Sequence, residues 1–203
     1  LGFRDLEIFN QALLGKQVWR ILQNPSCLMA RILKARYFPD CSILEAVQKK
    51  KASYAWKSIL YGKELVSKGM RYIIGDGSHI KMWNDPWLPD HPPRAPRPRD
   101  GEIITGFKIC DYFKPGGHDW DEQKLRNEVL PEDVIWIMKI KISPHGQQDL
   151  LGWSYNEDGL YTVKSGYWLG THLPRQQLIQ PTYGDVELKQ RLWKTQITPK
   201  IKH

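Results

Sequence analysis

The stretch RYIIGDGSHIKMWNDPWLPD, residues 71–90, decides how the middle of the chain folds. Two short apolar runs, 72–74 and 79–83, flank a Gly-Asp-Gly-Ser loop centred on Asp76. Glycines in such a loop supply the positive φ angles that a tight hairpin needs, so the pattern predicts a β-hairpin. Asp76 is expected to be a turn residue, because Asp beside Gly is typical of turn chemistry.

The same stretch carries residues that invite a catalytic interpretation. His79 lies three positions after Asp76, but we expect it to be a strand residue without a catalytic role. Trp83 and Trp87 are expected to pack a proline turn against the hairpin. This stretch is therefore predicted to be scaffold.

Upstream of it, residues 1–70 show helical periodicity and read as a basic helical subdomain. A first amphipathic helix is predicted over 6–23 and is stopped by Asn24-Pro25. Ser26 is the expected N-cap of a second helix that ends near Tyr37. A third helix is expected to start at Ser53 and to end at a C-terminal Gly69.

Downstream, residues 84–100 contain six prolines, and we expect 91–100 to be an extended linker that carries Arg94, Arg97 and Arg99 as exposed charge. Residues 101–203 are predicted to form a small helix-hairpin-helix unit. Its first elements are a helix that starts at Asp119-x-x-Glu122 and a helix over 132–139 after Pro131. A hairpin of 150–155 with 160–164 follows. The last elements are a short helix capped by Ser165 and an amphipathic segment over 185–195. The predicted fold class is α+β: a helical N-terminal subdomain, then two β-hairpins with short helices.

Composition restricts the class of protein. The chain has 203 residues, 41% of them hydrophobic, with nine tryptophans, which is typical of a folded domain. Mean hydropathy is −0.53, and no apolar run approaches the roughly 18 residues of a membrane span. The N-terminus lacks a signal-peptide pattern, and three cysteines spaced far apart suggest a reducing compartment. We expect an intracellular protein, nuclear or cytoplasmic, that is neither secreted nor bound to a membrane.

The positive charge is concentrated in the first third of the chain. Residues 1–72 hold 13 Lys and Arg against 5 Asp and Glu, which accounts for the whole net charge of +8. A segment of this kind fits either a surface that meets a polyanion or a set of solvated helix faces. For single residues the solvated face is favoured, whereas the regional excess favours binding. The candidate nucleic-acid-binding residues are Lys16, Arg20, Arg31, Lys34, Arg36, Lys49, Lys50 and Lys51.

Sequence signatures of catalysis are missing. The chain contains no Gly-x-Ser-x-Gly, no P-loop motif, no His-Glu-x-x-His and no Asp-Asp pair that could hold polymerase metals. The cysteines form no Cys-x-x-Cys pair, and Cys110 with His118 is a poor start for a zinc site. We therefore predict no catalytic residue, no metal site and no cofactor in this segment.

Four blocks carry a family resemblance: LGFRDLEIFNQALLGKQVWRIL, RILKARYFP, GDGSHIKMWNDPWLP and GLYTVKSGYWL with LWKTQITPKIKH. In this order they resemble plant LINE-type (non-LTR) retrotransposon reverse transcriptases, in the region after the polymerase core that reaches into the zinc-binding segment before a ribonuclease H-like domain. The resemblance implies a parent RNA-directed DNA polymerase whose catalytic aspartates would precede Leu1 and whose zinc ligands would follow His203. Residues 101–203 would then begin the zinc-binding segment without its ligands.

Two functions remain open from the sequence. The first is an accessory region that binds RNA or DNA backbone without sequence preference, beside the flanking polymerase and ribonuclease H-like domains. The alternative is a structural spacer or protein-interaction module, including a decayed retroelement copy without activity. Polymerase activity is expected of the parent polyprotein and not of this segment alone.

Overall fold

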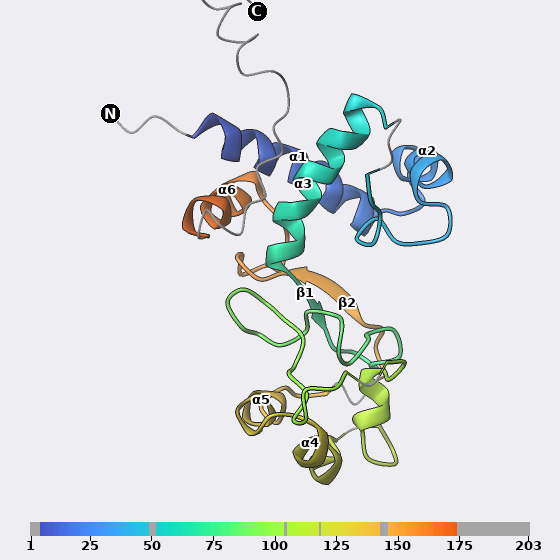
Figure 1. Cartoon of the computed structure of the whole chain (residues 1–203), viewed down its shortest axis with the longest axis vertical. Helices are drawn as coiled ribbons and strands as arrows, with labels where there is room; N and C mark the ends of the chain where they lie inside the picture. The colour runs from blue at the N-terminus through green and yellow to red at the C-terminus, as the bar shows by residue number, and fades with distance from the viewer. Residues whose placement is uncertain (1–4, 49–51, 104, 118, 143–145, 174–203) are drawn as a thin grey trace, which may run out of the picture. The chain divides into compact units, whose positions relative to one another are not determined.

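The computed structural model describes residues 5–48, 52–103, 105–117, 119–142 and 146–173. They form six α-helices, one 3-10 helix and one two-stranded antiparallel sheet, so the predicted α+β class is confirmed (Figure 1). In chain order these are α1 Leu6–Gln23, α2 Leu28–Tyr37, α3 Tyr54–Gly69, β1 Met70–Ile73, η1 Ile109–Tyr112, α4 Glu122–Glu128, α5 Pro131–Ile137, β2 Leu150–Trp153 and α6 Val163–His172. Two compact units are distinguished, Leu1–His172 and Leu173–His203, and the elements above all belong to the first. The predicted segment 185–195 lies outside the described residues.

Side-chain capping sets the starts of α1 and α3, but not that of α2. The Asp5 carboxylate accepts hydrogen bonds from the backbone N–H groups of Glu7 and Ile8 and so begins α1. Ser53 accepts from Trp56 N at the start of α3, as the sequence predicts. The prediction for α2 is wrong by one residue: Cys27, not Ser26, occupies the N-cap position, and its side chain makes no capping hydrogen bond.

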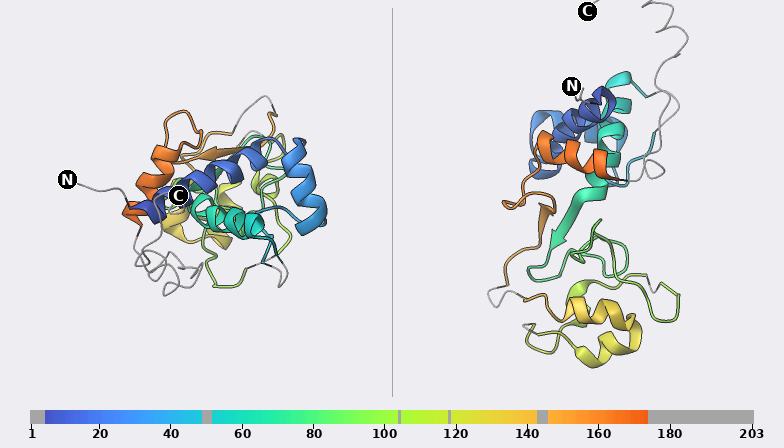
Figure 2. Two further views of the ribbon diagram at one scale, coloured as in Figure 1. Left: turned by 90° about the horizontal axis from the view of Figure 1, so that it is seen from above. Right: turned by 90° about the vertical axis from the view of Figure 1, so that its left-hand side faces the viewer.

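Helices α1, α3 and α6 pack into one core, and the two views of Figure 2 show them side by side. A Cβ atom placed on Gly62 of α3 would lie 2.5 Å from the backbone carbon of Leu14, so the backbones of α1 and α3 touch where they cross. Tyr161, just before α6, is fully buried and donates its hydroxyl proton to the Ala12 carbonyl oxygen at 2.9 Å. The predicted subdomain of residues 1–70 therefore shares its core with a helix from residues 163–172.

Gly69 differs from its predicted role. It is the last residue of α3, and it is not among the glycines that have a positive φ angle. A side chain at this position would overlap the Trp153 ring and meet Leu169 at 2.8 Å. Close packing, rather than a left-handed cap, explains the glycine.

The sheet corrects the predicted hairpins. Strand β1 follows α3 directly and pairs with β2, with Met70 opposite Trp153 and Ile73 opposite Leu150. Residues 80–82 instead hydrogen-bond to residues 107–109, since Met82 N donates to the Phe107 carbonyl and Ile109 N to the Ile80 carbonyl. The two runs of the first predicted hairpin, 72–74 and 79–83, therefore do not pair with each other. The apolar alternation in 79–83 reflects burial and does not indicate which segment supplies the hydrogen bonds.

The second predicted hairpin is also replaced. Trp153 N donates to the Gly159 carbonyl at 2.7 Å across a short turn, and the chain then enters α6 instead of a return strand. Thr162, not Ser165, precedes the helix: Ser165 N donates to Thr162 Oγ1, and Thr162 N donates back to Ser165 Oγ. This reciprocal pair has the geometry of a capping box.

A second core contains Trp83, Trp87 and Trp120. Trp87 is 1% exposed, donates its indole N–H to the Met82 carbonyl at 2.9 Å and stacks on Trp120. Trp83 is 5% exposed, which agrees with its predicted packing role. Helix α4 is capped by Asp121, not by the predicted Asp119. Helix α5 runs from Pro131 to Ile137, whereas the sequence predicts a helix over 132–139. Full burial of an aromatic side chain of this kind stabilises the fold by about 1.5–3 kcal/mol.

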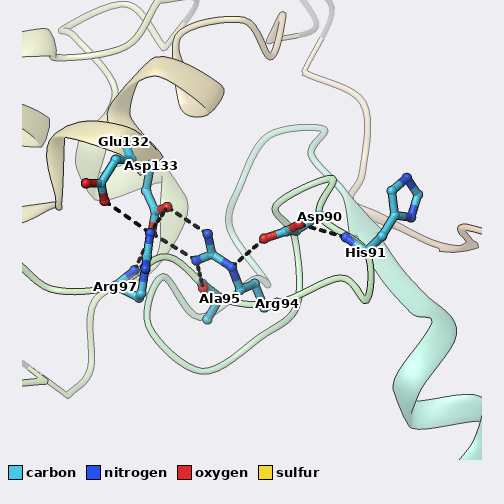
Figure 3. A network of polar contacts seen from close by, with 7 residues as sticks. All are labelled: Asp90, His91, Arg94, Ala95, Arg97, Glu132 and Asp133. Atoms are coloured by element: carbon cyan, nitrogen blue, oxygen red, sulfur yellow. Dashed lines mark hydrogen bonds and ion pairs between the residues drawn. The ribbon is translucent and has the colours of Figure 1, made fainter. Parts of the chain in front are cut away.

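The proline-rich segment folds tightly against α5, contrary to the prediction of an extended linker. Arg97 and Arg99 are exposed, as predicted, whereas Arg94 is half-buried. Pro93 and Pro96 are buried, and Arg94 and Arg97 both reach the carboxylate of Asp133, whose side chain is 1% exposed (Figure 3). The Arg97 carbonyl accepts from Leu130 N, and Arg99 N donates to Glu128 O. We call Asp133, Arg94, Arg97 and Asp90 the arginine clasp.

Electrostatics explain how the clasp tolerates a buried carboxylate. Burial alone would raise the pKa of Asp133, but hydrogen bonds from Arg94 and Arg97 outweigh it and hold that pKa below the usual range. Two guanidinium nitrogens of Arg94 lie 2.9 and 2.7 Å from the Asp133 carboxylate oxygens, and the backbone N–H of Arg97 donates to the same carboxylate at 2.8 Å. The carboxylate is therefore ionised and fully hydrogen-bonded.

Candidate nucleic-acid interface

The basic residues of α1 occupy two different environments. Lys16 is exposed overall, but its Nζ atom donates to the Tyr161 carbonyl oxygen at 2.8 Å and so ties α1 to the start of α6. Arg20, one helical turn later, is exposed near the end of α1. Lys16 therefore has a structural role that the sequence does not reveal, whereas Arg20 faces solvent.

Helix α2 carries the other three described candidates, all of them exposed: Arg31, Lys34 and Arg36. Arg31 and Lys34 are one turn apart, while Arg36 lies on the opposite flank of the helix because each residue turns about 100°. Leu28 and Ile32, 70% and 57% exposed, lie between these flanks on the solvent side. The helix thus presents two basic edges around an apolar strip instead of one continuous basic stripe.

These five residues have no carboxylate partner among the described residues, a feature that they share with several other cations of the chain. Within the described ranges, ion pairs engage Lys81, Arg94, Arg97 and Arg126, and none engages the candidate cations of α1 and α2. Arg36 instead lies over the Tyr37 ring, 5.5 Å from its centroid. The positive charge of the α1 and α2 candidates is therefore not neutralised by carboxylates among the described residues. Lys49, Lys50 and Lys51 lie outside the described residues.

A second cluster, which the sequence does not predict, surrounds the Gly-Asp-Gly-Ser loop. The Asp149 carboxylate, just before β2, accepts from the backbone N–H groups of Gly75, Gly77 and His79 at 2.8–3.0 Å. Asp76 remains a turn residue, as predicted, because its carboxylate accepts from Ser78 N. Hydrogen bonds from Ser78 lower the pKa of Asp76.

His79 does not lie on a strand, contrary to the prediction. Ligand-type atoms of Asp76, His79 and Asp149 all lie within 4.8 Å of one another, a spacing that would suit a divalent cation. The hydrogen bonds to Asp149 already account for its position, since it closes the loop on β2. Sequence reasoning missed Asp149 because it lies more than 70 residues after the loop, with no local motif to mark it.

Comparisons with known proteins give two relatives. One, from Arabidopsis thaliana and named "Uncharacterized mitochondrial protein", is 51% identical over 96 residues, which is 47% of this chain and 62% of the relative. The other, from the same plant and named "Putative ribonuclease H protein", is 28% identical over 214 aligned residues, covering 100% of this chain and 32% of the relative. The chain thus spans less than two thirds of either relative.

Other comparisons are negative. No protein-family model matches the chain. No solved structure matches it either. Among the described residues, no helix combines the length and apolar character needed to cross a membrane.

Proposed function

We propose that the chain is a nucleic-acid-binding accessory segment of a retroelement polyprotein. It would lie after the polymerase core of a plant LINE-type reverse transcriptase and reach toward the ribonuclease H-like domain. Support comes from the four sequence blocks and from the alignment of the whole chain with a longer protein whose name refers to ribonuclease H. Its partners would be RNA or DNA backbone and the flanking domains, inside the nucleus or cytoplasm, with no cofactor in this segment.

The observation that carries the proposal is the free positive charge of α1 and α2. Arg20, Arg31 and Lys34 are exposed and unpaired within the described residues, so their charge is available to phosphates. Contacts of this kind release condensed counterions, which makes affinity depend steeply on salt and little on sequence. Lys16 contributes less, because its ammonium already bonds to Tyr161 O.

The test is a fluorescence-anisotropy titration of the full chain with a labelled duplex DNA and a labelled single-stranded RNA at several salt concentrations. The double variant Arg31→Ala/Lys34→Ala should bind duplex DNA more weakly and reduce the slope of log K against log salt by about 1.8, at about 0.9 for each lost phosphate contact. The matched control is Lys81→Ala/Arg126→Ala, which removes the same charge from two exposed, ion-paired residues. Equal slopes for the two double variants would overturn the proposal.

A second candidate function rests on the apolar strip of α2. Leu28 and Ile32 are more than half exposed, which suits a surface that packs on another protein or domain. As a spacer or interaction module, the isolated chain should self-associate in sedimentation velocity, and Leu28→Ser/Ile32→Ser should suppress this. A chain that stays monomeric at high concentration and unfolds cooperatively would argue against this candidate.

Catalysis is not proposed for this segment. The parent polyprotein would be the RNA-directed DNA polymerase, while the chain itself would lack the carboxylates that hold the polymerase metals. Incorporation of dNTPs by the purified chain would contradict this assignment.

A further inference from the structure

Four aromatic rings from three segments form a row at the surface of the first unit: His91, Tyr155, Trp168 and His172, here called the aromatic row. Successive ring centroids lie 5.9, 5.7 and 4.2 Å apart. His91 comes from the proline-rich segment, Tyr155 from the turn after β2, and the last two from α6. The row is contiguous in space although its members span 81 positions in the sequence.

The row is both exposed and held in place. Trp168 is 48% exposed, and His172 is exposed as well. His172 Nδ1 lies 2.7 Å from the Trp168 carbonyl oxygen, and the imidazole stacks on one face of the indole at 17°. Tyr155 is backed by the buried Trp153, with centroids 5.7 Å apart. Rings fixed in this way lose little conformational freedom when a ligand binds.

The arginine clasp holds the other end of the row. His91 N donates to Asp90 Oδ1 at 2.8 Å, and Asp90 is paired with Arg94, which in turn reaches Asp133. Figure 3 shows the His91 imidazole extending away from this network. The backbone of His91 is thus anchored while its ring remains free to contact a ligand.

Charge around the row favours an anionic ligand that also has aromatic faces. Lys164 lies one helical turn before Trp168, is exposed, and has no ion pair within the described part of the chain. Two of the neighbouring carboxylates are engaged elsewhere: Asp158 accepts from Asn156 Nδ2 and Leu160 N, and Asp90 bonds to Arg94. Glu157, two positions after Tyr155, is an exposed carboxylate. Lys164 is therefore a free cation near the row, with Glu157 as the acidic group left to oppose it.

We propose that the aromatic row is a stacking platform for unpaired bases of single-stranded RNA or DNA, with Lys164 contacting a phosphate. This inference rests on the proposed nucleic-acid-binding function and adds a second contact surface to it, with a different physical basis. Stacking on aromatic side chains is available only where bases are unpaired, and it does not depend on counterion release. The α1–α2 cations would therefore bind any backbone, while the row would favour single strands.

The experiment compares Trp168→Ala with Trp136→Ala in the full chain. Trp136 is 50% exposed on α5 and lies outside the row, so it is a matched control for loss of an exposed indole. Dissociation constants are measured for a labelled oligouridine, an oligothymidine and a blunt DNA duplex over a range of salt. Trp168→Ala should weaken single-strand binding about 5- to 150-fold, which corresponds to the usual effect of one stacked base.

Further readouts separate stacking from loss of structure. With Trp168→Ala, duplex binding should change less than about two-fold, and the salt slope should stay at the wild-type value. Trp168→Phe keeps a stacking face and should recover most of the single-strand affinity. Thermal unfolding of each variant confirms that the fold is intact.

The outcomes distinguish the two proposals. If Trp168→Ala binds single strands like Trp136→Ala while Arg31→Ala/Lys34→Ala loses affinity, the stacking platform is refuted and the proposed function stands. If Trp168→Ala weakens duplex and single-strand binding equally, stacking is refuted as the mechanism. If the unmodified, folded chain binds none of the three nucleic acids at low salt, both proposals fail.

Discussion

The arginine clasp allows the sharpest test of how this fold is held together. In Asp133→Asn the buried carboxylate is replaced by an amide of nearly equal size. The amide has one oxygen fewer than the carboxylate, and its NH₂ group faces guanidinium nitrogens that are themselves donors. In the native protein these nitrogens lie 2.7–3.3 Å from the carboxylate oxygens. The variant therefore removes both the charge and part of the acceptor capacity at a site that is 1% exposed.

The expected magnitude follows from the exposure of the partners. Breaking a fully buried ion pair costs about 3–5 kcal/mol. Here the side chains of Arg94 and Arg97 are 32% and 52% exposed and regain water, so we expect the lower end, about 3 kcal/mol. For a chain of this length, that corresponds to a fall in melting temperature of roughly 6–12 °C.

The assay is urea unfolding followed by tryptophan fluorescence, with calorimetry as a second probe. Glu132→Gln is the control, because Glu132 pairs with the same Arg97 at 3.2 Å but is 73% exposed. Its effect on the free energy of unfolding should stay within about 0.5 kcal/mol. A loss below about 1 kcal/mol for Asp133→Asn would refute the claim that the clasp stabilises the proline-rich segment.

Three further predictions concern the clasp, the 75–79 loop and the crossing of α1 and α3. Because folding lowers the pKa of Asp133, its ionised carboxylate should contribute its full share of the free energy of unfolding above the unfolded Asp pKa of about 3.9, and less as pH falls below that value. When stability is measured against pH in the acid range, Asp133→Asn should lack this pH-dependent contribution. Asp149→Ala leaves three backbone N–H groups of the 75–79 loop without an acceptor, so it should lower the free energy of unfolding by about 2–3 kcal/mol. Asp76→Asn should lower it by less than about 1 kcal/mol. Chemical denaturation measures both. Gly62→Ala brings a methyl group to 2.5 Å from the Leu14 backbone and should cost about 1–3 kcal/mol in thermal melts; an unchanged melting temperature would contradict the close crossing of α1 and α3.

Signals that act within one or two turns predicted structure well. The bounds of α1 and the Ser53 cap of α3 agree with the sequence interpretation, and α5 begins at Pro131, one residue before the predicted start. Each depends on a side chain or a proline acting on its own backbone neighbours, so the sequence contains the whole cause. Where the nominated cap does not form, as at Ser26, the N-cap position lies one residue later, at Cys27.

The candidate nucleic-acid interface was also predicted only in part from the sequence. The sequence located the excess charge and named Arg20, Arg31 and Lys34, but their lack of ion pairs became visible only in the structure. Lys16 looked equivalent to them until its bond to Tyr161 O, 145 positions away, was seen. Burial and pairing depend on neighbours that the chain supplies from elsewhere, and no local pattern records them.

By itself, the amino-acid sequence determined the helical character of the first 70 residues, the turn at Asp76, the packing roles of Trp83 and Trp87, and the α+β class. Tertiary structure alone decided that β1 pairs with β2 instead of closing a hairpin, and that Arg94 and Arg97 reach Asp133. The physical reason is that apolar periodicity reports how much of a segment is buried, whereas strand pairing and ion pairing depend on which distant segment lies next to it. Those choices are made by the packing of the whole unit.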